Sequence, residues 1–121
     1  MKTYEFSTKL HNRKNSAGKT VEKVRVWLEE STNNRFLSDA GFKRGAPVQI
    51  VIDKGENSIS GEITIQLSET GNKKVAGKAD RALFDITRNS DQMPAAFHPK
   101  NNSTLVAYVQ TGLITIKVKG W

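Results

Sequence analysis

The chain contains no cysteine among its 121 residues. It can therefore form neither a disulfide framework nor a thiolate metal site, and a reducing cytoplasm is the simplest location for it. No apolar run approaches the roughly 20 residues that a membrane helix needs, so we expect no membrane partner. The opening residues MKTYEFSTKL also lack the continuous apolar segment of a signal peptide.

Positive charge is what the chain has in excess. Its formal net charge is +7 and its pI is about 9.8, which favours nucleic acid, an anionic membrane or an acidic protein as a partner. Residues 1–25 carry seven Lys and Arg against two Glu, and a second group of cations comprises Lys73, Lys74, Lys78 and Arg81. The alternative for each group is a solvated surface that only keeps the protein in solution.

Alternating apolar residues predict strands at 3–10 and 20–28, and the polar residues 11–19 predict a loop between them. In the second of these strands, Val24, Val26 and Leu28 fall on one face and Arg25 and Trp27 on the other. We therefore expect a long N-terminal hairpin with a basic tip formed by Arg13, Lys14 and Lys19.

The segment 29–42 changes to helical spacing and predicts a short helix, capped by Asn33 or Asn34 and followed by Gly41. The rest of the chain is expected to alternate between strands and polar connections: strands at 48–53 and 62–67, a linker at 68–80, a strand at 81–86, a second short helical turn at 90–97 with Ser90 as its cap, and a strand pair at 104–118 around Gly112.

The two halves of the chain share one order of elements, namely strand, short helix, strand, turn and strand. Residues 24–67 form the first unit and residues 81–118 the second, with Phe42 matching Phe97 and ITIQL matching ITIKV. Such a unit cannot bury its apolar face alone, but two units can pack as a pseudo-symmetric pair. We therefore predict one domain, 1–121: a small, mainly β, pseudo-two-fold barrel with two short helices, plus the N-terminal strand and hairpin of residues 1–23.

The elements of the first unit resemble the core motif of SymE-like proteins. The matching residues are Trp27-Leu28-Glu29, Ala40-Gly41-Phe42, Gly45 and the strand from Val48 to Ile52. SymE in turn resembles the AbrB/MazE swapped-hairpin family, whose members are mostly DNA-binding regulators and antitoxins that form one barrel from two chains. The resemblance implies that the second unit supplies the missing partner within the same chain, and that residues 1–23 lie outside the family unit.

The sequence is also similar to the small barrel domain that precedes the catalytic domain of phage-type DNA cytosine methyltransferases. Methyl transfer there needs a cysteine nucleophile, which this chain lacks. A zinc or iron site is not expected either, because His11 and His98 lie in separate polar segments without carboxylates at ligand spacing. We therefore expect no catalytic residue, no metal and no cofactor. RNA cleavage, by resemblance to SymE-like RNA-targeting toxins, is the one enzymatic alternative, with His98 as the residue to test.

Binding fits the basic residues better than catalysis does, because each Lys or Arg that neutralises a phosphate releases counterions and strengthens binding. A two-stranded ribbon can also enter a DNA groove. The candidate nucleic-acid-binding residues are Arg13, Lys14, Lys19, Lys23, Arg25, Lys43, Arg44, Lys73, Lys74 and Lys78. The AbrB resemblance puts Arg25, Lys43 and Arg44 first. We expect Trp27 to pack against the N-terminal hairpin rather than to stack on bases.

Two classes of function therefore stay open. The first is a small basic DNA-binding regulator of AbrB/SymE type, from a bacterium or a mobile element. The second is a phage or mobile-element protein that binds and inhibits a host nuclease or defence complex, as anti-CRISPR and anti-restriction proteins do. The expected partners are nucleic acid, with DNA favoured, or an acidic or nucleic-acid-processing protein, and the chain is expected to be a monomer or a homodimer.

Overall fold

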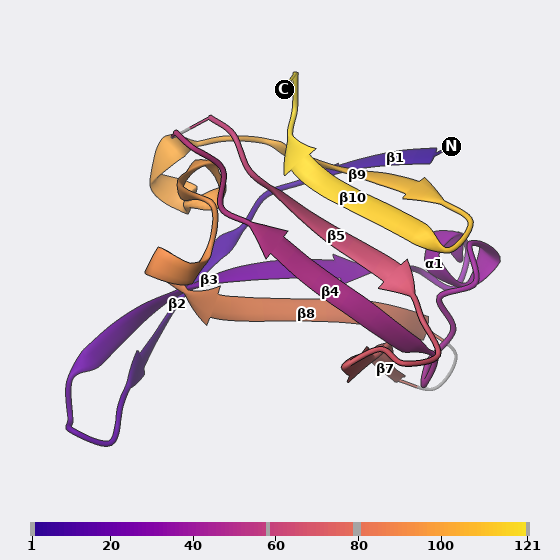
Figure 1. Cartoon of the computed structure of the whole chain (residues 1–121), viewed down its shortest axis with the longest axis horizontal. Helices are drawn as coiled ribbons and strands as arrows, with labels where there is room; N and C mark the ends of the chain where they lie inside the picture. Colours follow the sequence, from indigo (N-terminus) through magenta and orange to yellow (C-terminus); the bar gives the residue numbers. More distant parts are fainter. Residues whose placement is uncertain (1, 58, 79–80, 121) are drawn as a thin grey trace.

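The computed structural model describes residues 2–57, 59–78 and 81–120, without the side chain of Lys78. Its strands form two sheets (Figure 1). The six-stranded sheet has the order β1 (Lys2–Phe6), β9 (Leu105–Gln110), β10 (Leu113–Val118), β5 (Glu62–Leu67), β4 (Pro47–Asp53) and β6 (Lys73–Lys74). The four-stranded sheet has the order β2 (Lys9–Lys14), β3 (Thr20–Glu29), β8 (Arg81–Asn89) and β7 (Ala76–Lys78).

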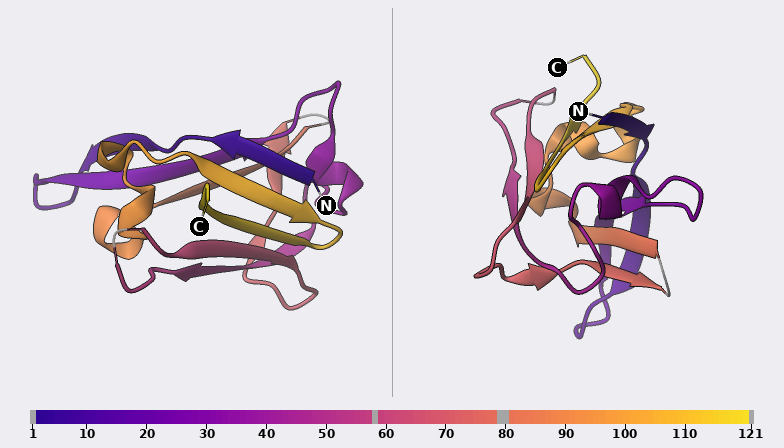
Figure 2. Two further views of the ribbon diagram at one scale, coloured as in Figure 1. Left: turned by 90° about the horizontal axis from the view of Figure 1, so that it is seen from above. Right: turned by 90° about the vertical axis from the view of Figure 1, so that its right-hand side faces the viewer.

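The two sheets face each other and enclose the core, as both views of Figure 2 show. The strands β3, β5 and β10 contribute alternate side chains to it, which is the period-2 pattern seen in the sequence. Residues that are completely buried include Val24, Val26, Ile63, Ile65, Ile114 and Ile116. Phe42, also completely buried, meets Phe84 edge to face with ring centroids 5.8 Å apart. The prediction of a mainly β protein is confirmed.

The expected closed barrel is not found, because the described strands divide into two sheets. The chain passes from the six-stranded to the four-stranded sheet between β1 and β2 and again at Val75 between β6 and β7, and it returns between β3 and β4 and between β8 and β9. At the first change, Thr8 turns inward and its buried hydroxyl donates to the carbonyl of Phe97. The single strand predicted over 3–10 is therefore wrong. The expected loop 11–19 is also wrong in its length, since β2 continues to Lys14 before the turn.

The expected linker, 68–80, also contributes structure, because β6 and β7 lie within it. The first helix departs from the prediction at its N-terminal end and agrees with it at its C-terminal end. The helix α1 (Phe36–Asp39) has Arg35 as its N-cap residue, without a side-chain cap, so the Asn33 or Asn34 cap is wrong. Gly41 follows the helix with φ +96°, as predicted, and a Cβ there would lie 2.9 Å from Leu67 Cδ1.

The predicted second helical turn, 90–97, is two separate 3₁₀ turns, η1 (Ser90–Gln92) and η2 (Ala95–Phe97), followed by a third, η3 (Pro99–Asn101). Pro94 and Pro99 explain the interruptions, because proline lacks the backbone N–H that a continuing helix needs. The cap is also displaced by one residue. Asn89, not Ser90, forms the capping box with Gln92.

A local two-fold relation connects the two halves of the fold. In the central pair of the six-stranded sheet, Thr64 of β5 lies opposite Thr115 of β10, and these threonines occupy equivalent positions of the sequence repeat. In the four-stranded sheet, Trp27 of β3 lies opposite Asp85 of β8, again at equivalent positions. When each strand of β1–β5 is exchanged for the strand numbered five higher, each sheet keeps its strand order, read from the opposite edge. The repeating unit therefore has five strands, and β1 and β2 correspond to β6 and β7 rather than lying outside the repeat.

Candidate nucleic-acid interface

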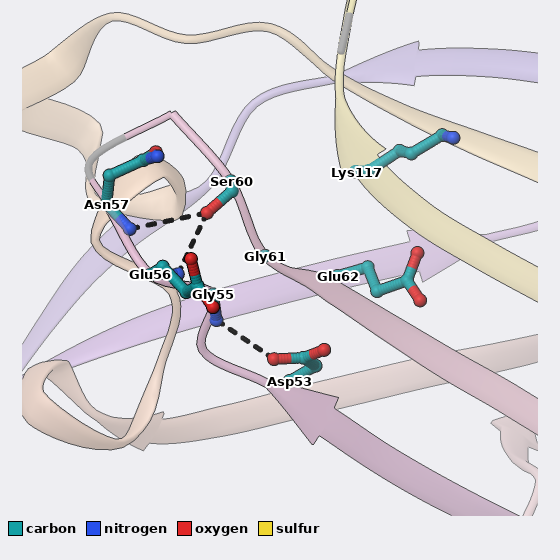
Figure 3. Close-up of a pocket in the computed structure, with 8 residues that line it drawn as sticks. All are labelled: Asp53, Gly55, Glu56, Asn57, Ser60, Gly61, Glu62 and Lys117. Carbon is teal, nitrogen blue, oxygen red and sulfur yellow. Dashed lines mark hydrogen bonds between the residues drawn. The ribbon is translucent and has the colours of Figure 1, made fainter.

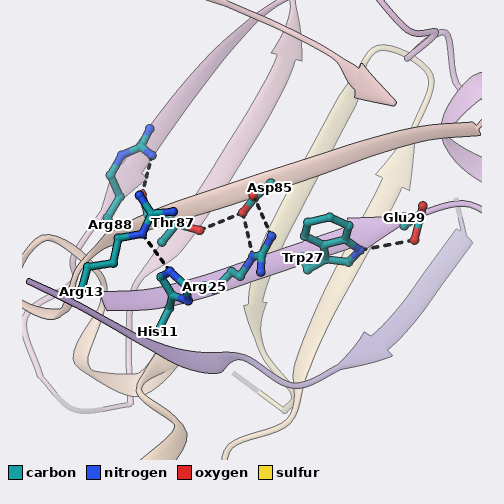
Figure 4. A network of polar contacts seen from close by, with 8 residues as sticks. All are labelled: His11, Arg13, Arg25, Trp27, Glu29, Asp85, Thr87 and Arg88. Atoms are coloured by element: carbon teal, nitrogen blue, oxygen red, sulfur yellow. Dashed lines mark hydrogen bonds and ion pairs between the residues drawn. The ribbon is translucent and has the colours of Figure 1, made fainter. Parts of the chain in front are cut away.

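The outer face of the four-stranded sheet gathers polar and cationic side chains because its inner face is buried. Val24, Val26 and Leu28 point into the core, so the residues between them point outward. Residues directly opposite each other in an antiparallel pair share a face, which adds side chains from β2 and β8. We call this surface the hairpin face; it comprises Lys9, His11, Arg13, Lys23, Arg25, Trp27, Asp85 and Thr87. Figure 4 shows six of these residues, all except Lys9 and Lys23.

Arg25 is held in place by a carboxylate from the neighbouring strand. Its Nε and Nη2 donate to the two carboxylate oxygens of Asp85 at 3.1 and 3.0 Å, and Thr87 Oγ1 donates to Asp85 at 2.8 Å. Burial raises the pKa of Asp85, but the bonds from Arg25 and Thr87 outweigh it and leave that pKa below the ordinary aspartate value. Arg25, the first residue that the AbrB resemblance favours, therefore has its charge largely compensated.

A second contact of the hairpin face joins two side chains of β2. Arg13 Nε donates to His11 Nε2 at 2.9 Å. In this contact the imidazole nitrogen is the acceptor. A cavity of about 310 Å³ opens beside these groups and is lined by His11, Arg13, Lys23, Arg25, Asp85 and Thr87.

The hairpin continues beyond the body of the protein. The β2–β3 ladder extends to the pair Lys14–Thr20, and Asn15 closes the turn by accepting bonds from the backbone N–H groups of Ala17 and Lys19 at 2.9 and 3.0 Å. We call residues 12–22 the hairpin extension, and Figure 1 shows it projecting from one end of the molecule. It presents exposed Arg13, Lys14 and Lys19, with Lys14 on the face opposite to Arg13.

The other predicted cations lie at the opposite end of the long axis (Figure 1). Lys43 and Arg44 are exposed in the connection between α1 and β4. This connection binds the β6–β7 corner, because Gly45 N donates to Val75 O at 2.9 Å and Val75 N donates to Ala46 O at 3.0 Å. We call Lys43, Arg44, Lys73 and Lys74 the corner group; the side chain of Lys78 lies outside the described residues.

The ten predicted residues therefore do not form one continuous surface. The structure brings Arg13, Lys23 and Arg25 together and separates them from the corner group. Lys9 and His11, which were not among the predicted residues, face Arg25 and Lys23 across the ladder. The charge of residues 1–25 was the available signal, but only the β2–β3 register places these residues on the same face.

Trp27 differs from its prediction. It does not pack against the N-terminal hairpin but lies on the hairpin face with 40% of its surface exposed. Arg25 Cζ lies 4.4 Å from the centroid of its ring, and its Nε1 donates to Glu29 Oε1 at 3.4 Å. The alternation within 20–28 predicted its direction correctly, whereas the expected packing partner was wrong.

His98 forms a tie between the second half and the hairpin. Its Nε2 lies 2.6 Å from Glu22 Oε1, and its Nδ1 accepts a bond from the backbone N–H of Lys100 at 3.1 Å. Nε2 is therefore the nitrogen that donates. This bond holds the pKa of Glu22 below its ordinary value. Because both ring nitrogens have partners, the geometry indicates a structural tie at the base of the hairpin extension.

A larger hollow, of about 630 Å³, lies at the turn between β4 and β5 (Figure 3). Its lining includes the carboxylates Asp53, Glu56 and Glu62, with Lys117 as the cation. Asp53 accepts a bond from Gly55 N at 3.0 Å, and Ser60 Oγ accepts one from Glu56 N at 3.0 Å, so these side chains also shape the turn. Its negative charge makes this hollow unsuitable for phosphate.

Within the described residues, no group of three or more His, Asp or Glu side chains is arranged to hold a metal ion. The same residues include no helix that is long and apolar enough to cross a membrane. Comparison of the chain with protein-family models, curated proteins and solved structures finds no match.

Proposed function

We propose that the protein binds nucleic acid, and DNA in particular, through the hairpin face and the hairpin extension. The observation that carries this proposal is the gathering of Lys9, Arg13 and Lys23 on one face of the β2–β3 ribbon, whose residues 12–22 project from the body. A projecting two-stranded ribbon fits the width of a DNA major groove, and exposed cations supply phosphate contacts. The lack of cysteine fits a reducing cytoplasm, which is the compartment we propose.

The preference for DNA comes from the resemblance to SymE-like and AbrB/MazE proteins. The two-fold register of both sheets supports that relationship, because the family forms its fold from two copies of one unit. On this proposal the chain is a DNA-binding regulator that contains both copies. The hairpin extension is then an addition to one copy that increases contact with the ligand.

A second candidate is a protein that binds and inhibits a nucleic-acid-processing enzyme. The observation in its favour is Leu10, which is 41% exposed on β2, an edge strand of the four-stranded sheet. A partner can add a strand to such an edge, and Leu10 would then supply apolar contact. This binding would tolerate moderate salt and would weaken in Leu10→Ser.

The test is binding of the purified protein to a labelled random-sequence duplex in a salt series from about 50 to about 200 mM. We expect affinity to fall steeply with salt, and the salt slope to decrease by about one for each phosphate-contacting cation removed. The variant Lys9→Glu/Arg13→Glu/Lys23→Glu should abolish binding. The matched control, Lys43→Glu/Arg44→Glu, removes cations of the corner group and should retain most of the affinity.

Absence of binding at the lowest salt would contradict the proposed function. Loss of binding in the Lys43→Glu/Arg44→Glu variant alone would contradict the choice of surface and transfer it to the corner group. Arg25 is left unchanged in both variants, because its replacement would also leave Asp85 without its partner.

A further inference from the structure

Trp27 is an exposed aromatic ring whose position is fixed. It lies at the end of the hairpin face, just beyond the last β2–β3 pair, Lys9–Arg25, where Arg25 packs on its ring and Glu29 accepts a bond from its indole nitrogen. Arg25 is itself fixed by the two bonds to Asp85. A side chain that is already ordered loses little conformational entropy when a ligand binds, so this ring is well prepared for contact.

A cavity of about 310 Å³ lies beside the ring, lined by Ser7, Lys9, Arg25 and Trp27. Its volume falls at the lower end of the range found for small-ligand sites, about 300 to 1,000 Å³. The local sequence explains why it is open. β1 ends at Phe6 and β2 begins at Lys9, so the chain leaves the four-stranded sheet beside Trp27 and places the small side chain of Ser7 there.

The lining combines two groups that single-stranded nucleic acid requires. The ring offers a π-face for a base, and the ammonium group of Lys9 offers a charge for the neighbouring phosphate. The cavity shared by His11, Arg13 and Lys23 continues the same face along the hairpin, because Arg25 lines both cavities. A strand whose base occupies the first cavity can therefore run its backbone along the second.

We infer that Trp27 stacks on an unpaired base of the nucleic acid, with Lys9 on the adjoining phosphate. This inference rests on the proposed binding of nucleic acid but not on the major-groove geometry, because its ligand is a strand with at least one unpaired base, such as single-stranded DNA. A base inside a duplex is already stacked on its neighbours, and its extrusion costs a few kcal/mol. If a base must stack on Trp27, the protein should therefore bind a single strand more tightly than a duplex.

The chain has two tryptophans, Trp27 and Trp121, and the experiment uses the Trp121→Phe variant, in which only Trp27 is left to fluoresce. A thymidine homopolymer, a random-sequence duplex of the same length and polyglutamate are titrated separately into this protein. We expect the single strand to quench the fluorescence of Trp27 and to bind more tightly than the duplex. Trp27→Leu should weaken binding of the single strand about tenfold to hundredfold, and Trp27→Phe should restore part of it.

Tyr108→Leu is the matched control. Tyr108 lies on the six-stranded sheet with Lys117 Nζ 5.3 Å from its ring centroid, so it reproduces the aromatic–cation pair away from the hairpin face. We expect this variant to bind as the parent does. Melting temperatures of all variants show that lost binding does not reflect unfolding, and Lys9→Ala tests the phosphate contact without changing the ring.

Three results would overturn the inference, and they differ in whether they also contradict the proposed function. Salt-dependent binding of the duplex, with unchanged affinity in Trp27→Leu, would overturn stacking and leave the proposed function intact. Binding of neither nucleic acid would remove both. Quenching by polyglutamate alone would assign the cavity to an acidic protein.

Discussion

The two halves of the protein share a strand order and register but differ at their first hairpin. The last pair of the β7–β8 ladder is Lys78–Arg81. In the β2–β3 ladder the equivalent pair is His11–Lys23, but this ladder continues for three more pairs, to Lys14–Thr20. The shared part of each half supplies the core, and the added residues 12–22 supply only exposed or half-buried side chains. The comparison indicates that the repeated unit supplies the core, and on the proposed function the asymmetric addition supplies contact with the nucleic acid.

A second difference lies at the end of the central pair β3–β8. At one end of this pair of strands, Val24 of β3 lies opposite Arg88 of β8. The two-fold relation makes Ala82 equivalent to Val24 and Glu30 equivalent to Arg88, and at the other end Glu30 N donates to Ala82 O. Glu30 is only 1% exposed. Its carboxylate accepts bonds from Ser38 N, Ser38 Oγ and Ala82 N at 2.9, 2.7 and 2.8 Å. Glu30 thus joins α1 of the first half to β8 of the second.

The largest effect is expected when this connection is removed. Glu30→Ala leaves three donors without their acceptor, one on buried Ala82 and two on half-buried Ser38, so we expect the free energy of unfolding to fall by about 3 to 4 kcal/mol. Arg88→Ala, the counterpart in the second half, removes one bond to the carbonyl of Thr87 and should cost about 1 kcal/mol. Urea unfolding of both variants gives the comparison. Equal losses would show that Glu30 has no special role in joining the halves.

The next prediction makes the two halves alike. Replacing residues 12–22 with Asn-Gly joins His11 to Lys23 through two residues, the same number that separates the paired residues Lys78 and Arg81 in the sequence. We expect the protein to remain folded, because no fully buried side chain is lost, and the salt slope of nucleic-acid binding to decrease by about three. Binding in a salt series and thermal unfolding measure these two effects.

Arg13→Gln/Lys14→Gln/Lys19→Gln in the full-length chain is the control for that experiment. It removes the same three cations and keeps the ribbon. A similar slope in both variants would assign the effect to charge, and a larger loss in the shortened protein would assign the rest to the shape of the ribbon. Unchanged binding in both would show that the hairpin extension is not the contact surface.

Local patterns in the sequence predicted several elements of this fold. Gly41 was identified as the end of the first helix, and the match of ITIQL with ITIKV corresponds to the central pair β5–β10. The break after Phe6 could not be predicted in this way. The apolar alternation continues across it to Leu10, whereas its stabilising contact joins Thr8 to Phe97, far along the chain. Long-range pairing, not propensity, decides where that strand divides.

The candidate site shows the same limit. Alternation within β3 placed Arg25 and Trp27 on one face, as observed. The groups that determine what Arg25 contributes, however, come from another strand. Asp85 reaches Arg25 from β8, and the sequence shows no local sign of the pairing that compensates its charge. The composition therefore predicted a basic surface, whereas the division into two separate basic groups required the tertiary structure.

The smallest effect concerns the tie between the halves at the hairpin extension. Because the bond from His98 lowers the pKa of Glu22 in the folded protein, this carboxylate stabilises the fold above its ordinary pKa. That contribution is lost as the pH falls through the lowered value. Glu22→Gln keeps an acceptor for His98 but cannot titrate. We therefore expect the stability difference between parent and variant to be constant near neutral pH and to decrease in acid.

Urea unfolding at a series of pH values from about 7 to about 3 measures this difference, with the exposed Glu69 of the β5–β6 connection as the control in Glu69→Gln. A decrease for Glu22→Gln that exceeds the one for Glu69→Gln supports the tie. The shortened protein, which lacks residue 22, should follow the acid dependence of Glu22→Gln and not that of the parent. If it followed the parent, the acid-sensitive carboxylate would have to lie in the repeated body, and the hairpin extension would be fixed by its ladder alone.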